Sequence, residues 1–181
     1  MKKDEFVFRL KQLAPSREDY HRLNFSDDSI TELIKRFECN PLNNDLFNSI
    51  KNDEILELLN TYDCSKVEIG LLNLNKTVQE FPNYYLIGKI DSDIIALNKI
   101  TLEIETLDHE GRNHLLWSCA ASSKRFLNSI LTAAEFFSRR IKDPGLANNK
   151  VFTNEYVLNC TDKAGGKKYI DFYKMLLGNF D

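Results

Sequence analysis

The residues best suited to chemistry gather near position 110, where Asp108, His109, Glu110 and His114 precede Cys119. Imidazole, carboxylate and thiolate groups are common zinc ligands, and a Cys–His pair can act as a nucleophilic dyad. A helix places residues i and i+4 on one face, but His109 and His114 are five positions apart across an expected turn. We therefore predict no metal site here. Because Cys119 follows an apolar strand, we interpret it as a core residue rather than a nucleophile.

Other patterns fall short of known catalytic or phosphate-binding motifs. The chain has three histidines, at positions 21, 109 and 114, and no Gly-x-Ser-x-Gly elbow, so nothing supports a hydrolase triad. Residues 163–168 (Lys-Ala-Gly-Gly-Lys-Lys) lack the residue order of a P-loop, and we interpret them as the entry to a helix. Tyr169, Phe172 and Tyr173 have helical spacing and are expected to pack in the core. The sequence thus predicts a protein that is not an enzyme and binds no cofactor.

The composition suits one globular domain over residues 1–181. The chain is 43% apolar and 28% charged, and this apolar share is enough to form a buried core without disulfides or a structural metal. No apolar run approaches the roughly 20 residues of a membrane span. The formal net charge of −3 is unlike that of the basic domains that bind nucleic acid. We therefore expect neither a membrane nor a nucleic acid among the partners.

The N-terminus and the cysteines indicate a cytoplasmic protein. Lys2 and Lys3 resemble the start of a signal peptide, but no apolar stretch follows them. The four cysteines, at positions 39, 64, 119 and 160, show no Cys-x-x-Cys spacing. We interpret them as reduced thiols that act as small hydrophobic residues.

The hydrophobic pattern changes period twice along the chain, which predicts an α+β domain. Residues 1–62 are expected to be helical, with helices over 6–14, from the Ser-Asp-Asp-Ser cluster at 26–29, and over 45–62. Ser29 and Glu32 have the spacing of a capping box. Residues 66–118 are rich in β-branched and aromatic residues and predict a mixed, mainly antiparallel sheet of about five strands packed against helices. The expected strands are 67–72, 84–89, 93–98, 101–107 and 114–118. Residues 122–181 predict C-terminal helices over 122–141 and 169–177.

Two details concern the expected strands. The pair Asn98-Lys99 predicts a tight hairpin between strands 93–98 and 101–107. In the second of these strands, apolar residues alternate with Glu103 and Glu105, which predicts a sheet with one face in water. Trp117, flanked by apolar residues, is expected to be buried.

The strand region also concentrates acidic residues. Residues 81–121 contain three basic and six acidic side chains, whereas residues 122–181 contain ten basic and six acidic ones. The six acidic residues are Asp91, Asp93, Glu103, Glu105, Asp108 and Glu110. They have two interpretations: a solvated sheet face with polar turns, or an acidic surface that steers a basic partner.

An ordered set of motifs over residues 66–141 resembles the SUKH superfamily. The set comprises Tyr84–Gly88, Asp93–Leu97, the hairpin to Ile104, Asp108–Glu110, Ala120–Ser123 and the pair Phe126-Leu127. Residues 89–92 replace the family's glycine-rich stretch, which points to a divergent subgroup. The resemblance implies a sheet backed by helices and no catalytic residues. It also implies a bacterial immunity protein that binds and neutralises a toxin.

Three hypotheses of function follow. The first is a cytoplasmic immunity protein that occludes a cognate toxin, such as a basic nuclease, with the six acidic residues as the binding surface. The second is a regulatory or scaffolding module of the cell-wall-synthesis-regulator type. The third is an enzyme that uses His109, His114 and Cys119.

Overall fold

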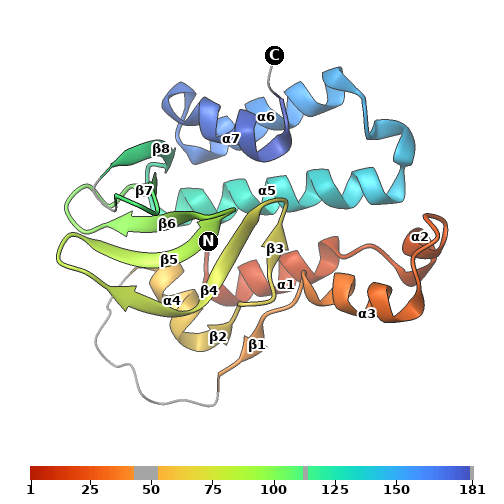
Figure 1. Ribbon diagram of the computed structural model, residues 1–181, viewed down its shortest axis with the longest axis horizontal. Coiled ribbons are helices and arrows are strands. Elements are labelled where there is room, and N and C mark those ends of the chain that lie inside the picture. Colours follow the sequence, from red (N-terminus) through yellow and green to blue (C-terminus); the bar gives the residue numbers. More distant parts are fainter. Residues whose placement is uncertain (43–52, 112–113, 180–181) are drawn as a thin grey trace.

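The computed structural model describes residues 1–42, 53–111 and 114–179, and it shows helices packed against an antiparallel sheet (Figure 1). The predicted α+β class is therefore confirmed. The main sheet has six strands in the described residues where about five were predicted, and every pairing between them is antiparallel rather than mixed.

The N-terminal part contains four helices in the described residues: α1 (Lys3–Leu13), α2 (Arg17–His21), α3 (Asp27–Lys35) and α4 (Glu54–Thr61). Helix α1 buries Phe6 and Leu10 and ends before Pro15, as its pattern predicted. Helix α3 begins one turn earlier than the expected capping box, because the Ser26 side chain, not that of Ser29, caps it. The start of the helix expected over 45–62 lies outside the described residues. The short helix α2 was not predicted.

The main sheet is a meander in which each strand pairs with its neighbour in the chain. Its order is β3 (Glu68–Ile69), β4 (Leu72–Glu80), β5 (Tyr84–Ile90), β6 (Asp93–Asn98), β7 (Ile104–Leu107) and β8 (Leu115–Ala120). A separate ribbon joins β1 (Asn40–Pro41) to β2 (Tyr62–Asp63). The predictions for β5 and β6 were close to the observed bounds. Strand β4 was missed beyond its first residue, because Asn73, Asn75 and Lys76 interrupt its apolar pattern.

Two expectations for the strand region were wrong. The link between β6 and β7 is not a tight hairpin but a five-residue loop, residues 99–103, in which the Asn98 side chain accepts hydrogen bonds from the backbone N–H groups of Ile100 and Thr101. Trp117 is 36% exposed, because β8 is the edge strand of the sheet and covers only part of the indole.

The C-terminal part forms α5 (Ser123–Lys142), α6 (Lys150–Ala164) and α7 (Ile170–Leu177), with short 3₁₀ turns at Pro144–Leu146 and Lys167–Tyr169. Ser122 caps α5 by accepting a hydrogen bond from the Arg125 N–H, as expected from the sequence. Helix α6 was not predicted. It buries residues such as Phe152 and Val157 but exposes Val151 and Leu158, so its apolar residues do not form one clear stripe.

Helix α5 organises the core. It packs against α1, α4 and α6 and also contacts strands β3 and β8 (Figure 1). Phe126, Ile130 and Phe136 on this helix are fully buried. Tyr169, Phe172 and Tyr173 are also buried, which confirms that these aromatic residues pack in the core. Within the described ranges, no helix combines the length and apolar character needed to cross a bilayer.

Candidate functional site

The six acidic residues of the strand region do not form one surface. Strand register separates them into three groups: an end of the sheet, its middle, and its opposite end. Ile94 pairs with Leu107, so Asp93 and Asp108 lie one position further, at the same end of β6 and β7. Leu97 pairs with Ile104, which places Glu103 at the other end. Glu105, opposite Ala96, lies between them.

Four carboxylates gather at one end, which we call the acidic end: Asp91, Asp93, Asp108 and Glu110. Asp91 is in the two-residue turn between β5 and β6, where its φ of 52° is in the left-handed region that aspartate tolerates. Asp93 starts β6, while Asp108 and Glu110 follow β7. The β5–β6 turn and the segment after β7 thus bring two separate pairs of acidic residues to the same end of the sheet.

The local geometry holds the acidic end in place. The Asp93 carboxylate accepts a hydrogen bond from the His109 N–H and lies 3.3 Å from His109 Nδ1. The Asp108 carboxylate accepts from the Glu110 N–H at 2.9 Å, and this backbone hydrogen bond is the main reason that the pKa of Asp108 is lowered. Asp108 therefore stays ionised at neutral pH.

The histidines adjoin these carboxylates. His109 and His114 lie 3.6 Å and 3.7 Å from Asp108 oxygens. Among the residues that the structure describes, no Lys or Arg forms an ion pair with the acidic end. Within those residues, Asp93, Asp108 and Glu110 lie beside histidine rings rather than beside a permanent cation.

One set of atoms at the acidic end has a spacing suited to a metal ion. Ligand atoms of Asp93, Asp108 and His109 lie within 4.8 Å of one another. Sequence spacing did not indicate Asp93 as a member, because it belongs to the neighbouring strand. All three side chains are partly or largely exposed, and exposed acidic groups often approach one another without an ion, so we assign no cation to them.

Glu103 is committed to a contact within the chain. Its two carboxylate oxygens lie 2.7 Å from Lys168 Nζ, and one of them accepts a hydrogen bond from the Tyr169 hydroxyl at 2.9 Å. This contact joins the β6–β7 loop to the connection between α6 and α7. Residues 163–168 thus end α6 and lead into the 3₁₀ turn before α7, which is the helix entry that the sequence predicted. They also supply Lys168 to this contact.

Glu105 is not on a solvated face. It is 6% exposed, and both of its oxygens accept from the Asn98 side-chain amide, at 3.2 Å and 3.3 Å. The pKa of Tyr84 is raised, first by burial and then by Glu105. The expectation that this side of β7 faces water was therefore wrong: Leu107, on the same side, packs with Leu86 and Ala96 in a second small core.

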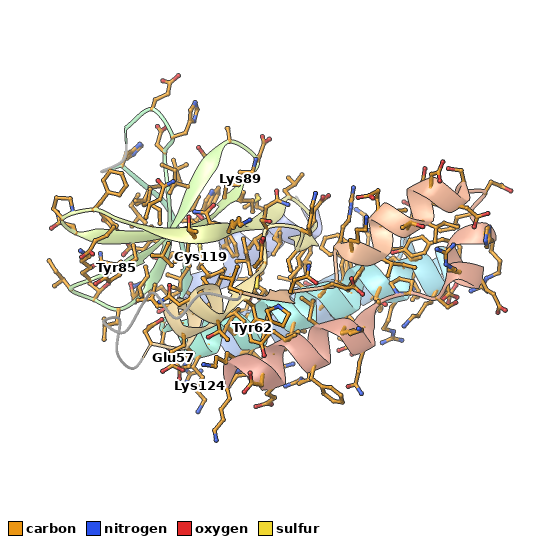
Figure 2. The ribbon with its side chains drawn as sticks, turned by 90° about the horizontal axis from the view of Figure 1, so that it is seen from below. Glu57, Tyr62, Tyr85, Lys89, Cys119 and Lys124 are labelled. Carbon is orange, nitrogen blue, oxygen red and sulfur yellow. The ribbon has the colours of Figure 1, made fainter. Side chains whose placement is uncertain are left out.

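Cys119 lies inside the molecule, as the sequence predicted (Figure 2). Its sulfur is 3.2 Å from the Thr106 hydroxyl, and burial raises the pKa of its thiol. His109 and His114, by contrast, are largely exposed and face carboxylates. A buried protonated thiol is a poor nucleophile, so the arrangement does not support a Cys–His dyad.

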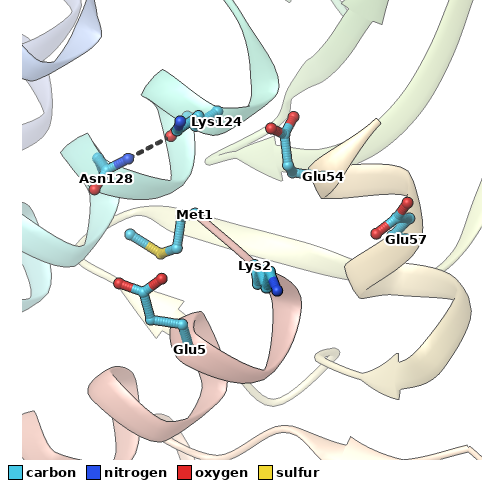
Figure 3. A pocket seen from close by; sticks show the side chains of 7 residues that line it. All are labelled: Met1, Lys2, Glu5, Glu54, Glu57, Lys124 and Asn128. Atoms are coloured by element: carbon cyan, nitrogen blue, oxygen red, sulfur yellow. Dashed lines mark hydrogen bonds between the residues drawn. The ribbon is translucent and has the colours of Figure 1, made fainter. Parts of the chain in front are cut away.

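A pocket of about 470 Å³ opens where α1, α4 and α5 meet (Figure 3). Glu5, Glu54 and Glu57 line it together with Lys2 and Lys124, and Met1 and Asn128 complete the wall. The Asn128 amide donates to the backbone carbonyl of Lys124 at 2.7 Å. No sequence motif indicated this pocket, because its lining comes from three separate segments. Its charges have both signs and do not select one class of ligand.

The chain was compared with known proteins at three levels. A scan against protein-family models, a search of curated proteins and a search of solved structures found no match. The class that the structure defines is thus an α+β fold with a six-stranded antiparallel meander in the described residues. The resemblance of residues 66–141 to the SUKH superfamily stays a prediction from the sequence.

Proposed function

We propose that this chain is an immunity protein that binds a cognate toxin in the cytoplasm and neutralises it by covering the toxin's active surface. The proposal starts from the resemblance to the SUKH superfamily. The structural observation that supports it best is the acidic end, where Asp91, Asp93, Asp108 and Glu110 converge without a recorded Lys or Arg partner in the described residues.

The chemistry of the acidic end suggests a basic partner. A nuclease toxin needs Lys and Arg side chains to hold phosphate, so its active groove is positively charged. A compact group of four carboxylates attracts such a groove over roughly a Debye length, which is about 8 Å at physiological ionic strength. Electrostatic attraction of this kind acts mainly on the rate of association.

The primary experiment is co-expression with the toxin encoded by the adjacent gene. Restored growth supports the immunity function, whereas continued growth arrest with both proteins present contradicts it. If the neighbouring gene encodes no toxin and the chain instead captures a host regulatory protein, the scaffolding hypothesis replaces this proposal.

The surface itself is tested with a double variant, Asp91→Asn/Glu110→Gln. It removes two charges, leaves the structural carboxylates of Asp93 and Asp108 intact, and keeps a residue at position 91 that tolerates positive φ. The matched control is Glu18→Gln/Glu155→Gln, which removes two exposed charges on helices α2 and α6. We expect slower association with the toxin at low salt for the first variant only. Equal association rates for both variants would exclude the acidic end as the contact surface.

A further inference from the structure

We infer that Cys39 and Cys64 are a redox pair that forms a disulfide bond when the protein meets peroxide. Their sulfur atoms lie 2.7 Å apart although the residues are 25 positions apart in sequence. A disulfide needs an S–S distance of about 2.05 Å, so the two atoms have to approach by only a fraction of an ångström. This inference does not depend on the proposed toxin-binding function.

The backbone already has the geometry of a cross-strand disulfide. In the ribbon of β1 and β2, Asn40 pairs with Asp63 and Pro41 with Tyr62. The same register, continued by one position, places Cys39 opposite Cys64. Directly opposed residues in antiparallel strands have Cα atoms about 4.5–5.5 Å apart, within the range of about 4.4–6.8 Å that disulfides accept. The register of the ribbon is therefore compatible with a bond between these two residues.

The other two cysteines are not arranged in this way. The Cys119 sulfur contacts the Thr106 hydroxyl, and the Cys160 thiol donates to the backbone carbonyl of Ser129 at 3.5 Å. Within the described part of the chain, the only recorded contact between two cysteine sulfurs is that of Cys39 with Cys64. Cys119 and Cys160 are therefore internal controls for nonspecific oxidation.

The two residues differ in exposure, and we take the more exposed one as the site of first attack. Cys39 is 9% exposed and Cys64 is 0% exposed, so peroxide reaches Cys39 first. Cys39 loses its proton and the thiolate attacks one peroxide oxygen; the O–O bond breaks, and the leaving hydroxide takes up that proton, so that a sulfenic acid and a water molecule form. The Cys64 thiol, already in contact with the Cys39 sulfur, then passes its proton to the sulfenic hydroxyl as its sulfur bonds to the Cys39 sulfur, and the hydroxyl leaves as a second water. In total, two thiols lose two electrons and two protons, and one hydrogen peroxide is reduced to two waters.

The disulfide would fasten a junction between several elements. Tyr62 on β2 donates through its hydroxyl to Asp4 of α1 at 2.7 Å, and Asp63 lies 3.2 Å from Lys76 Nζ on β4. The ribbon itself has only two residues in each strand. A covalent link beside it would limit the separation of β1 from β2 when the protein unfolds, and the oxidised form should be more stable.

The test uses the full chain with all four cysteines. The reduced protein is treated with hydrogen peroxide, unfolded, and labelled with a maleimide reagent, and the peptides are analysed by mass spectrometry. We expect the number of free thiols to fall from four to two and a linked peptide pair to contain Cys39 and Cys64. Four free thiols after treatment, or a bond that involves Cys119 or Cys160, would overturn the inference.

A pair of variants and a melting curve complete the test. Cys119→Ser/Cys160→Ser should still form the bond, whereas Cys39→Ser should not. The melting temperature of the wild-type protein should rise by roughly 5–10 °C on oxidation and return on reduction. An oxidised protein that melts at the same temperature as the reduced one would contradict the stabilising role. The assignment of the bond itself comes from the wild-type chain and does not require any variant to fold.

Discussion

Lys168 and Glu103 are 65 positions apart in sequence, yet both carboxylate oxygens of Glu103 lie 2.7 Å from the Lys168 ammonium. The contact closes the β6–β7 loop against the turn between α6 and α7. The contact also occupies the carboxylate of Glu103, which is one of the six acidic residues that the sequence offered as a binding surface. An acidic residue in a sequence is therefore available to a partner only where the fold supplies no cation of its own.

Replacement of Glu103 by Gln should lower stability modestly. Lys168 is more than half exposed, so water screens the pair, and we expect a loss of about 0.5–1 kcal/mol. The hydrogen bond from Lys168 is the largest cause that lowers the pKa of Glu103. A lowered pKa in the folded state contributes stability above the unfolded pKa, and this contribution is lost as pH falls through the folded value.

Thermal melts of wild type and Glu103→Gln should therefore differ at about pH 6 and converge towards about pH 3. The double variant Glu103→Gln/Lys168→Met is the control. Because either single change already breaks the ion pair, the double variant should lose no more stability than Glu103→Gln and Lys168→Met lose in total. A difference that is the same at every pH would show that the ion pair does not stabilise the fold.

Glu105 should respond to substitution as a buried residue rather than a surface one. Glu105→Lys places a cation beside the Asn98 amide in a site that is 6% exposed, and we expect a loss of about 3–5 kcal/mol. Glu105→Gln keeps the size and an acceptor oxygen and should cost much less. Urea denaturation measures both. If Glu105→Lys folds with wild-type stability, Glu105 is not buried against the Asn98 amide as described.

Gly88→Ala should destabilise the sheet. A Cβ atom at this position would lie 2.4 Å from the backbone oxygen of Asn73 on β4, so strands β4 and β5 would have to separate. We expect a loss of about 1–3 kcal/mol, as for other overpacked sites. Gly111→Ala is the matched control, since its nearest atom is 4.0 Å away. Chemical denaturation of the two variants should give clearly different midpoints, and equal midpoints would contradict the close approach.

Phe126→Ala should be the most damaging of the core changes. Phe126 is fully buried on α5, as the sequence predicted, and truncation of a buried phenylalanine typically costs about 3–5 kcal/mol. Val151→Ala is a useful reference because this residue is exposed on α6. Equilibrium unfolding in urea should shift strongly for Phe126→Ala and little for Val151→Ala. Similar shifts would indicate that α5 does not form the core.

The sequence was a reliable guide wherever burial produced a regular local pattern. The apolar stripes of α1 and α5 and the short runs of β-branched and aromatic residues in β5 and β6 predicted these elements and the burial of Phe126. Helix α6 was missed because exposed and buried apolar residues alternate irregularly along it. Local periodicity reports which side of one element faces the core, and it fails when an element has apolar residues on both sides.

Acidic composition and the class of fold were thus evident from the amino-acid sequence itself, because they depend on residue types and local period. Only the tertiary structure decided the fate of each carboxylate. Strand register gathered Asp93 and Asp108 at one end, the fold buried Glu105 beside the Asn98 amide, and the α6–α7 connection supplied Lys168 to Glu103. The same is true of Cys39 and Cys64, which one short ribbon brings into contact. These outcomes depend on contacts between residues distant in sequence, and a one-dimensional pattern carries no record of such contacts.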